Sequence, residues 1–187
     1  MSGLINELLD ISRVQMGREL DLIRSETDLV SLVRHIASEQ QHTTEQHEVS
    51  VSVLSPDIKG EWDADRLERA ITNLVSNAIT YSPGGGHIQI TVGLDGSNPA
   101  RAVVWVDDEG FGIPEQDLPF VFERFHRGSN VAGRIPGTGI GLAGAREIIR
   151  QHGGHVAAHP REGRGTTFEL TLPLQPPHVG GEADRDE

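Results

Sequence analysis

Hydrophobic residues recur at helical spacing in four stretches of the chain. The first lies within residues 4–17 and weakens after residue 17, so we expect the end of a longer helix there. Asp28 is a favourable N-cap for a second helix that continues through residue 36. A third helix is predicted over residues 66–80 and a fourth over about 140–152, where a pair of glycines follows the apolar pattern.

Alternation of apolar and polar residues predicts the strands. Valines alternate with serines at 49–53, which is typical of a half-buried strand. Residues 87–94 and 101–106 flank a short polar turn and predict a hairpin. Residues 155–159 and 166–172 alternate in the same way and predict a closing pair of strands.

The order of these elements favours one fold class. Residues 127–137 have no periodicity and contain three glycines, which predicts a mobile loop. Helices come first, and strands and helices then mix, with antiparallel hairpins among them. We therefore expect an α+β fold, a two-layer α/β sandwich with helices on one face of a mixed, mostly antiparallel sheet. A doubly wound parallel fold is disfavoured.

The composition narrows the chemistry. The 187 residues fit one domain with a short appendage, and the absence of cysteine excludes disulfides, thiolate zinc sites and cysteine nucleophiles. A formal net charge of -12 argues against a nucleic-acid surface. Lys59 is the only lysine and does not lie in a glycine-rich loop, so a bound phosphate would need arginine, backbone N–H groups or a metal.

The ends of the chain carry further expectations. No apolar run approaches the roughly 20 residues that span a bilayer, and the N-terminus lacks the basic region of a signal peptide. We therefore expect a cytoplasmic location without membrane contact by these residues, even if a longer parent protein is anchored in a membrane. Residues 176–187 are acidic and glycine-containing, which predicts a disordered tail.

Two asparagines stand out on the third predicted helix. Asn73 and Asn77 are four residues apart, so their amides project from one face, opposite the apolar face. A carboxamide oxygen is a neutral, hard ligand that suits Mg²⁺. The alternative is two solvated surface asparagines, but asparagine is a mediocre helix former, and two copies at this spacing need an explanation.

A second motif follows the predicted strand 101–106. Asp108 could accept a hydrogen bond from an exocyclic amine such as that of adenine, and Gly110 and Gly112 allow the backbone to approach a flat ring. The alternative is an ordinary Asp/Gly turn.

A third motif, residues 122–127, carries Arg124 and Arg127 beside the glycine-rich loop, where guanidinium groups suit phosphate. A surface amphipathic turn explains that motif equally well.

The fourth motif, residues 136–143, places glycines at alternate positions where a helix begins. Such a loop presents N–H groups to an anion. The same glycines match the dinucleotide fingerprint formally, but no strand is predicted before them, so there is no βαβ unit and we reject that interpretation.

Taken together and in this order, the four motifs resemble the N, G1, F and G2 boxes of sensor histidine kinases, and residues 163–168 resemble the last glycine box. The resemblance covers residues 63–174. Residues 4–17 resemble, less specifically, the end of the second helix of the dimerisation domain. We therefore expect three segments: a dimerisation-helix remnant and linker at 1–27, an ATP-binding catalytic domain at 28–175, and the acidic tail.

The resemblance implies the Bergerat-type fold of the GHKL superfamily, with ATP and Mg²⁺ as cofactors. It implies that the nucleotide is bound by Asn73, Asn77, Tyr81, Asp108, Gly110, Gly112, Ile113, Arg124, Arg127, Gly137, Thr138, Gly139, Gly141, Leu142 and Thr166.

By the same resemblance, each box has its own role. Asn77 would coordinate Mg²⁺, with Asn73 nearby helping to hold metal or phosphate. Tyr81 would stack near adenine, and Asp108 would accept from its amino group. Arg127 would reach the terminal phosphate. The glycines of the fourth motif would cradle the phosphates, Thr166 would line the base side, and residues 127–137 would form the ATP lid.

The sequence also departs from the family. Thr80 stands where many relatives carry Lys or Arg facing the phosphates, so we expect weaker phosphate binding. No box resembles the one that holds the phosphoacceptor histidine, and His35 and His42 have different neighbours. We therefore expect no catalytic acceptor here and a histidine-bearing dimerisation domain as partner. A chain that begins inside a helix favours truncation, and we expect a monomer.

Other functions remain as alternatives. The chain could be a non-catalytic, ATP-dependent interaction module, in which nucleotide orders the lid. A gyrase- or MutL-like ATPase is disfavoured because those relatives carry a glutamate where Asn73 stands, and an amide cannot activate water. Anti-sigma-factor kinases share the fold but lack the third motif. The spacing of His152, His155 and His159 suggests zinc only weakly, because two glycines separate the first from the others.

Overall fold

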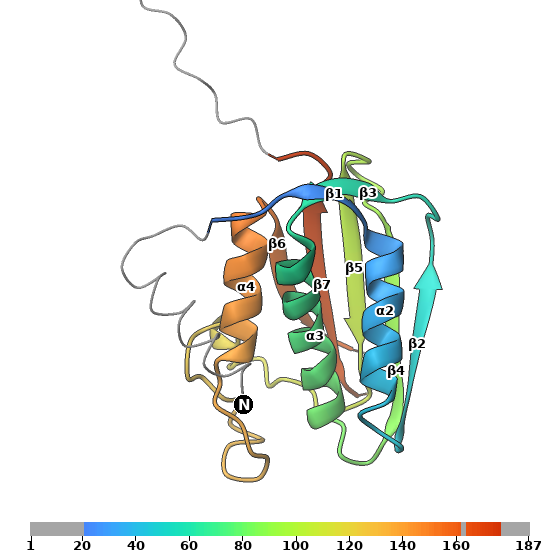
Figure 1. Cartoon of the computed structure of the whole chain (residues 1–187). Coiled ribbons are helices and arrows are strands. Elements are labelled where there is room, and N and C mark those ends of the chain that lie inside the picture. The colour runs from blue at the N-terminus through green and yellow to red at the C-terminus, as the bar shows by residue number, and fades with distance from the viewer. Residues whose placement is uncertain (1–20, 162–163, 177–187) are drawn as a thin grey trace, which may run out of the picture.

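The computed structural model describes residues 21–161 and 164–176 (Figure 1). The elements in chain order are β1 (Ser25–Asp28), α2 (Leu29–Gln41), β2 (His47–Val53), β3 (Lys59–Trp62), α3 (Ala64–Thr80), β4 (Gly86–Leu94), β5 (Arg101–Asp107), the 3-10 turn η1 (Leu118–Phe120), α4 (Gly141–Gln151), β6 (His155–Pro160) and β7 (Thr166–Pro173). The predicted helix within residues 4–17 and the acidic tail from residue 177 lie outside the described residues.

The main sheet has five strands in the order β2-β4-β5-β7-β6. β2 and β4 are parallel, whereas the three other neighbouring pairs are antiparallel. The helices α2, α3 and α4 lie side by side over one face of this sheet (Figure 1). This is the two-layer, mixed and mostly antiparallel sandwich that the sequence predicts.

The core lies between the helices and the sheet. The six apolar side chains of α3 that the sequence assigns to its inner face are all buried: Leu67, Ala70, Ile71, Leu74, Val75 and Ala78. They lie in one cluster with the inward residues of the central strands, including Ile90, Val104 and Leu170. Burial of each leucine, isoleucine and valine side chain in this set contributes about 1.5–3 kcal/mol, so this face of α3 fixes the helix on the sheet.

The predicted N-cap of α2 is confirmed, but the helix is longer than the apolar pattern indicates. The carboxylate of Asp28 accepts a hydrogen bond from the backbone N–H of Ser31 at 3.0 Å. The helix continues past the predicted end at residue 36 to Gln41. There the Gln41 amide donates to the backbone carbonyl of His47 at 3.0 Å and accepts from the N–H of Val49 at 2.8 Å. This tertiary contact holds a polar last turn that has no apolar periodicity.

The sequence analysis missed the two short strands β1 and β3. They pair with each other in an antiparallel register, from Ser25 opposite Trp62 to Asp28 opposite Lys59. Each has only four residues and neither shows a simple apolar alternation. Trp62 is fully buried and its indole N–H donates to the carbonyl of Pro173 at 2.8 Å, so this small sheet is attached to the end of β7.

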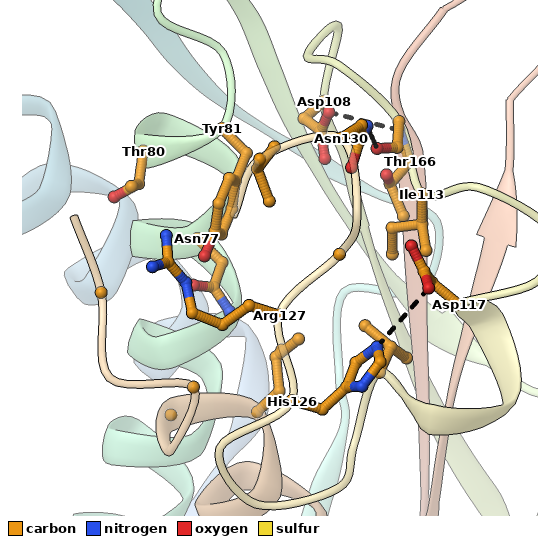
Figure 2. Close-up of a pocket in the computed structure, with 18 of the residues that line it drawn as sticks. Asn77, Thr80, Tyr81, Asp108, Ile113, Asp117, His126, Arg127, Asn130 and Thr166 are labelled. Atoms are coloured by element: carbon orange, nitrogen blue, oxygen red, sulfur yellow. Dashed lines mark hydrogen bonds and ion pairs between the residues drawn. The ribbon is translucent and has the colours of Figure 1, made fainter. Parts of the chain in front are cut away.

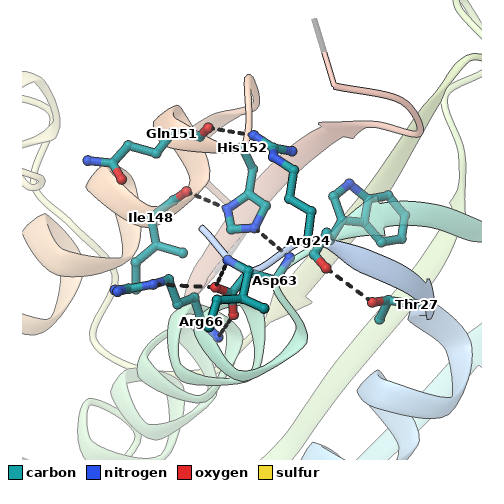
Figure 3. Close-up of polar contacts among 9 residues, drawn as sticks. Arg24, Thr27, Asp63, Arg66, Ile148, Gln151 and His152 are labelled. Atoms are coloured by element: carbon teal, nitrogen blue, oxygen red, sulfur yellow. Dashed lines mark hydrogen bonds and ion pairs between the residues drawn. The ribbon is translucent and has the colours of Figure 1, made fainter. Parts of the chain in front are cut away.

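A polar cluster joins the start of the described chain to two helices (Figure 3). The backbone N–H of Ile23 donates to the carboxylate of Asp63 at 2.9 Å, and Arg24 donates to the carbonyl of Gln151 at 3.0 Å. Fully buried His152 lies between these contacts. Its Nδ1 is 2.8 Å from the carbonyl of Ile148, and its Nε2 accepts from the N–H of Asp63 at 3.1 Å.

Burial disfavours the charged form of the His152 imidazole. Desolvation by burial lowers the pKa of His152, and the nearby Arg24 and Arg66 guanidinium groups lower it further, although the Ile148 carbonyl and Asp63 act in the opposite direction. Both ring nitrogens are engaged, so neither is available to a metal without loss of a buried hydrogen bond. His155 is exposed, and His159 lies 3.5 Å from Glu169.

Among residues 21–161 and 164–176, no helix is long and apolar enough to cross a bilayer.

We predict that His152→Gln removes a pH-dependent part of the stability. Because the pKa of His152 is lowered in the folded protein, the unfolded chain binds more protons below its ordinary value of 6.5. Through this group alone, the free energy of unfolding should fall as the pH drops from that value towards the folded pKa, with a slope of at most about 1.4 kcal/mol per pH unit. Urea denaturation over this pH range measures the slope.

The control is His155→Gln at the exposed position three residues further along, which should retain the wild-type slope. An unchanged pH dependence in His152→Gln would contradict the assignment.

Candidate functional site

A cavity of about 270 Å³ lies where the C-terminal end of α3, the start of α4 and the ends of β5 and β7 meet (Figure 2). Most of the predicted site residues line it: Asn77, Tyr81, Asp108, Gly112, Ile113, Arg127, Gly137, Thr138, Gly139, Gly141, Leu142 and Thr166. Segments that are distant in the sequence therefore converge on one space. Asn73, Gly110 and Arg124 are not among the lining residues.

The Asp108 carboxylate lies at one end of this cavity, beside Thr166 (Figure 2). The side chain is buried, and its Oδ1 accepts hydrogen bonds from the backbone N–H groups of Gly110 at 2.8 Å and Thr166 at 3.2 Å. Burial raises the pKa of Asp108, whereas the two backbone hydrogen bonds act in the opposite direction. The protein thus fixes one carboxylate oxygen from two sides and keeps a hydrogen-bond acceptor in a poorly hydrated position.

Gly110 lies behind the carboxylate, which explains why it does not line the cavity. A Cβ on Gly110 would lie 2.3 Å from the carbonyl oxygen of Tyr81, so only glycine fits between this turn and the end of α3. The N–H of Phe111 donates to the same Tyr81 carbonyl at 3.0 Å. Gly110 therefore acts by allowing the Asp108 turn to pack closely on the helix.

The two asparagines of α3 have different surroundings. Asn77 and Tyr81 point into the cavity next to Arg127 (Figure 2). Asn73 instead donates a hydrogen bond from Nδ2 to the carbonyl of Gly141 at 3.2 Å. Asn73 therefore ties α3 to the first residue of α4, and Asn77 is the amide that the structure leaves facing the cavity.

The loop at 127–139 covers the cavity. The Arg127 guanidinium donates to the carbonyl of Ile135 within the loop, and the Asn130 amide donates to the carbonyl of Gly112 at 3.0 Å. The hydroxyl and backbone N–H of Ser129 both donate to Asp117, at 2.8 and 2.7 Å. The hydrogen bonds of Asn130 and Ser129 connect the loop to Gly112 and Asp117, in the segment that follows the Asp108 turn.

Three buried polar atoms around this loop have no hydrogen-bond partner within the described part of the chain: Arg127 Nε, Asn130 Oδ1 and His126 Nε2, the last of which lies 3.9 Å from the carboxylate of Asp117 (Figure 2). All three residues line the cavity. Buried polar atoms are normally paired, so unpaired ones facing one space indicate that a polar ligand belongs there.

The sequence analysis missed Asp117, His126 and Asn130 as lining residues. The position of His126, directly before Arg127 in the third motif, was a usable signal. Asn130 lies in an aperiodic loop, and Asp117 follows the second motif at a distance, so the sequence carries no signal that places either residue at the cavity. Thr80 lines the edge of the cavity and is exposed, as befits a residue at the end of α3.

The third and fourth motifs are joined through backbone contacts. The N–H of Phe125 donates to the carbonyl of Gly139 at 2.8 Å. Gly139 has a φ of 69°, and a Cβ there would lie 2.7 Å from the carbonyl oxygen of His126.

Arg124 is partly buried outside the cavity. The hydrogen bond from Arg150 is the largest cause of the lowered pKa of Glu147, and the charge of Arg124 lowers that pKa further.

Comparisons with known proteins agree with this arrangement. Residues 62–176 match the family described as "Histidine kinase-, DNA gyrase B-, and HSP90-like ATPase". The chain belongs to this family. It is 35% identical over 94% of its length to the sensor histidine kinase WalK of Bacillus subtilis (strain 168), of which it covers 29%. It is also 33% identical over 97% of its length to the histidine-protein kinase/phosphatase MprB of Mycobacterium sp. (strain KMS), of which it covers 34%.

Solved structures give the same result for this histidine kinase-type ATPase domain. The mycobacterial sensor histidine kinase MprB superposes with a TM-score of 0.71 at 27% identity, covering 82% of this chain and 99% of that one. Histidine kinase ThkA, in complex with the response regulator protein TrrA, gives 0.72 at 26% identity, covering 94% and 48%. The predicted resemblance to sensor histidine kinases and the Bergerat-type fold are thus confirmed, and the chain spans about a third of the curated relatives' length.

We predict that Asp108→Asn abolishes detectable binding of adenine nucleotides. The change keeps the size of the side chain but replaces an anionic acceptor with an amide that can present a donor, so a buried pair with an amino group would be lost. Isothermal titration calorimetry with ADP measures the affinity. Asp95→Asn, at an exposed hairpin turn, is the control and should bind normally. Equal affinities of the two variants would remove the basis for the pocket assignment.

Proposed function

We propose that this domain binds Mg-ATP and donates the γ-phosphate to a histidine on a separate dimerisation domain. The observation that carries the proposal is the buried carboxylate of Asp108, fixed by two backbone N–H groups in a cavity that also contains Asn77 and Arg127. Within the proposal, residues 28–175 are the catalytic domain.

The two ends of the cavity differ in chemistry in the way that a nucleotide requires. Asp108 offers an acceptor to the adenine amino group, and Ile113, Leu142 and Phe168 add apolar surface for the base. At the other end, Arg127 and the glycine loop that begins α4 supply a guanidinium and backbone N–H groups for phosphates. The Arg127 Nε, which has no hydrogen-bond partner in the described part of the chain, is a donor of the kind that a polyphosphate would engage.

A magnesium ion fits the same end of the cavity. The side-chain amide of Asn77 points into it, and an amide oxygen is a suitable ligand for Mg²⁺, which keeps several waters and takes phosphate oxygens. When bound, the ion would neutralise phosphate charge. Within residues 21–161 and 164–176, no group of three His, Cys, Asp or Glu side chains forms a metal cluster, so an Asn-based site with phosphate is the arrangement that we propose.

Transfer to a protein is favoured over hydrolysis. In α3 the position that would need a water-activating base is held by Asn73, whose amide is bonded to the carbonyl of Gly141. An amide cannot accept a proton from water. Phosphoryl transfer needs positioning and charge stabilisation more than covalent chemistry, and an acceptor imidazole brings its own nucleophile.

A non-catalytic nucleotide-dependent module is the second candidate. The specific observation in its favour is Thr80, which lines the cavity edge without a positive charge for phosphates.

We propose a cytoplasmic, monomeric domain whose direct partner is the dimerisation domain. Because ThkA forms a complex with a response regulator, we further propose that a response regulator receives the phosphoryl group from the dimerisation domain.

We predict that Asn77→Ala removes the Mg²⁺ dependence of ATP affinity. The reason is that Asn77 is the amide facing the cavity, whereas Asn73 is occupied by Gly141. In Asn73→Ala, affinity should fall by a similar factor with and without Mg²⁺, since loss of one neutral hydrogen bond costs about 1 kcal/mol in either condition. Calorimetry with ATP in MgCl₂ or EDTA separates the two results. The opposite pattern would assign the metal to Asn73.

We predict that the domain alone is not labelled by γ-labelled ATP but transfers label to an added histidine-bearing dimerisation domain. The acceptor is taken from the same kinase, or from the related MprB. Gel autoradiography after mixing measures the transfer, and Asp108→Asn should abolish it. Tight ATP binding without any transfer to the acceptor of the same kinase would favour the non-catalytic module.

A further inference from the structure

A second cavity, of about 350 Å³, lies outside the nucleotide site. It is bounded by the turn after α3 and by the ends of the β6–β7 hairpin, and it is lined by Ser82, Gly84, Gly85, Glu109, Arg161 and Arg164. The turn between β5 and η1 separates the two cavities, because Asp108 lines the first and the next residue, Glu109, lines the second.

Two arginines give this cavity its chemistry. Arg161 donates from Nη1 to the carbonyl of Asp108 at 2.8 Å, and Arg164 donates from Nε to the carbonyl of Gly110 at 3.1 Å. A guanidinium has five N–H donors, so each arginine retains several after these bonds. Asp107 does not line the cavity and reaches Arg161 only at 4.0 Å. The backbone bonds hold both arginines beside the cavity, where Arg161 also interacts with the carboxylates of Asp107 and Asp108.

The hydroxyl of Ser82 is an independent sign of a ligand. Ser82 lines the cavity and is only 2% exposed, and its Oγ has no hydrogen-bond partner among the described residues. A buried hydroxyl is normally paired. In this structure the Oγ lies against Gly110, so a ligand with acceptor oxygens beside the arginines would reach this hydroxyl after a change of the Ser82 side-chain rotamer.

Glu109 opposes such a ligand. Its carboxylate lines the same cavity, but no ion pair within 4.0 Å connects it to Arg161 or Arg164 in the described part of the chain. Its Oε2 instead accepts from the backbone N–H of His87 at 3.4 Å. An anion bound at the arginines would therefore be weakened by a carboxylate that the arginines do not engage.

We propose that this second cavity binds a small oxyanion, a phosphoryl or carboxylate group, on Arg161, Arg164 and the Ser82 hydroxyl. Planar guanidinium groups suit both kinds of oxyanion because parallel N–H donors match paired oxygens. The same arginines hold the carbonyl groups of the Asp108 turn, so the anion site and the nucleotide cavity share one structural element.

Backbone amide NMR tests the proposal on the nucleotide-free domain. Sodium phosphate and, separately, sodium acetate are titrated at constant ionic strength while the resonances of Gly84, Gly85 and Arg164 are followed. Saturable shifts at these residues are expected with at least one probe. Saturation by phosphate alone indicates a phosphoryl ligand, and saturation by acetate indicates a carboxylate. Shifts that do not saturate with either probe would overturn the proposal.

Variants with opposite expected effects make the test specific. Arg164→Gln should weaken binding of the saturating probe about tenfold, because a charge-assisted contact is lost. Glu109→Gln removes the opposing charge but leaves both arginines in place, so it should tighten binding severalfold. Arg101→Gln, on β5 and bonded to Thr171, is the matched control and should not change the affinity. Unchanged affinity in both Arg164→Gln and Glu109→Gln would contradict the proposal.

A last variant separates this site from the nucleotide cavity, where phosphate would also meet a guanidinium. Arg127→Gln should leave the shifts at Gly84 and Gly85 unchanged. If the shifts disappear in Arg127→Gln, the ion binds in the nucleotide cavity and the second site does not exist. ADP affinity is measured independently, so failure of the anion site leaves the proposed kinase function intact.

Discussion

The candidate nucleotide cavity depends on a close approach of three backbone segments around Asp108. On one side, Gly110 lies against the carbonyl of Tyr81 at the end of α3, where a Cβ would be 2.3 Å from that oxygen. On the other side, a Cβ on Gly165 would lie 1.9 Å from the carbonyl oxygen of Asp108. Only glycine permits either contact. Because both contacts form, the N–H of Thr166 reaches the buried carboxylate and the acceptor is fixed before a ligand arrives.

The helix α3 links the stability of the domain to its site. Its apolar face belongs to the core, while Asn73 and Asn77 lie on the face towards α4 and the cavity. At its other end, the carboxylate of the N-cap residue Asp63 accepts from the N–H of Ile23, and the backbone N–H of Asp63 donates to Nε2 of buried His152 (Figure 3). The start of the described chain and the cavity are therefore attached to opposite ends of one helix. Because packed interiors deform little and transmit strain, a displacement at one end of this helix is carried to the other end.

The predictions from the sequence were correct where a local pattern of residues leads directly to one kind of secondary structure. The alternation of strand residues, the cap Asp28 and the apolar stripe of α3 are local patterns, and the structure contains each of them. It was least successful where a contact is decided by distant partners. The polar last turn of α2 is held by β2, and β1 exists because β3 pairs with it. Neither strand of that pair carries enough apolar alternation to be recognised alone.

The candidate site divides in the same way. The sequence by itself determined the identity of the boxes, because Asp108, Asn77 and the alternating glycines are chemical types that few other sites combine. The tertiary structure decided which of them face the cavity. It assigned Asn73 to the carbonyl of Gly141, placed Arg124 outside the cavity, and brought His126, Asn130 and Asp117 to its wall. The physical reason is that side-chain direction and burial depend on how the segments between β5 and α4 pack on one another and on α3, and those segments have no periodicity from which their path could be derived.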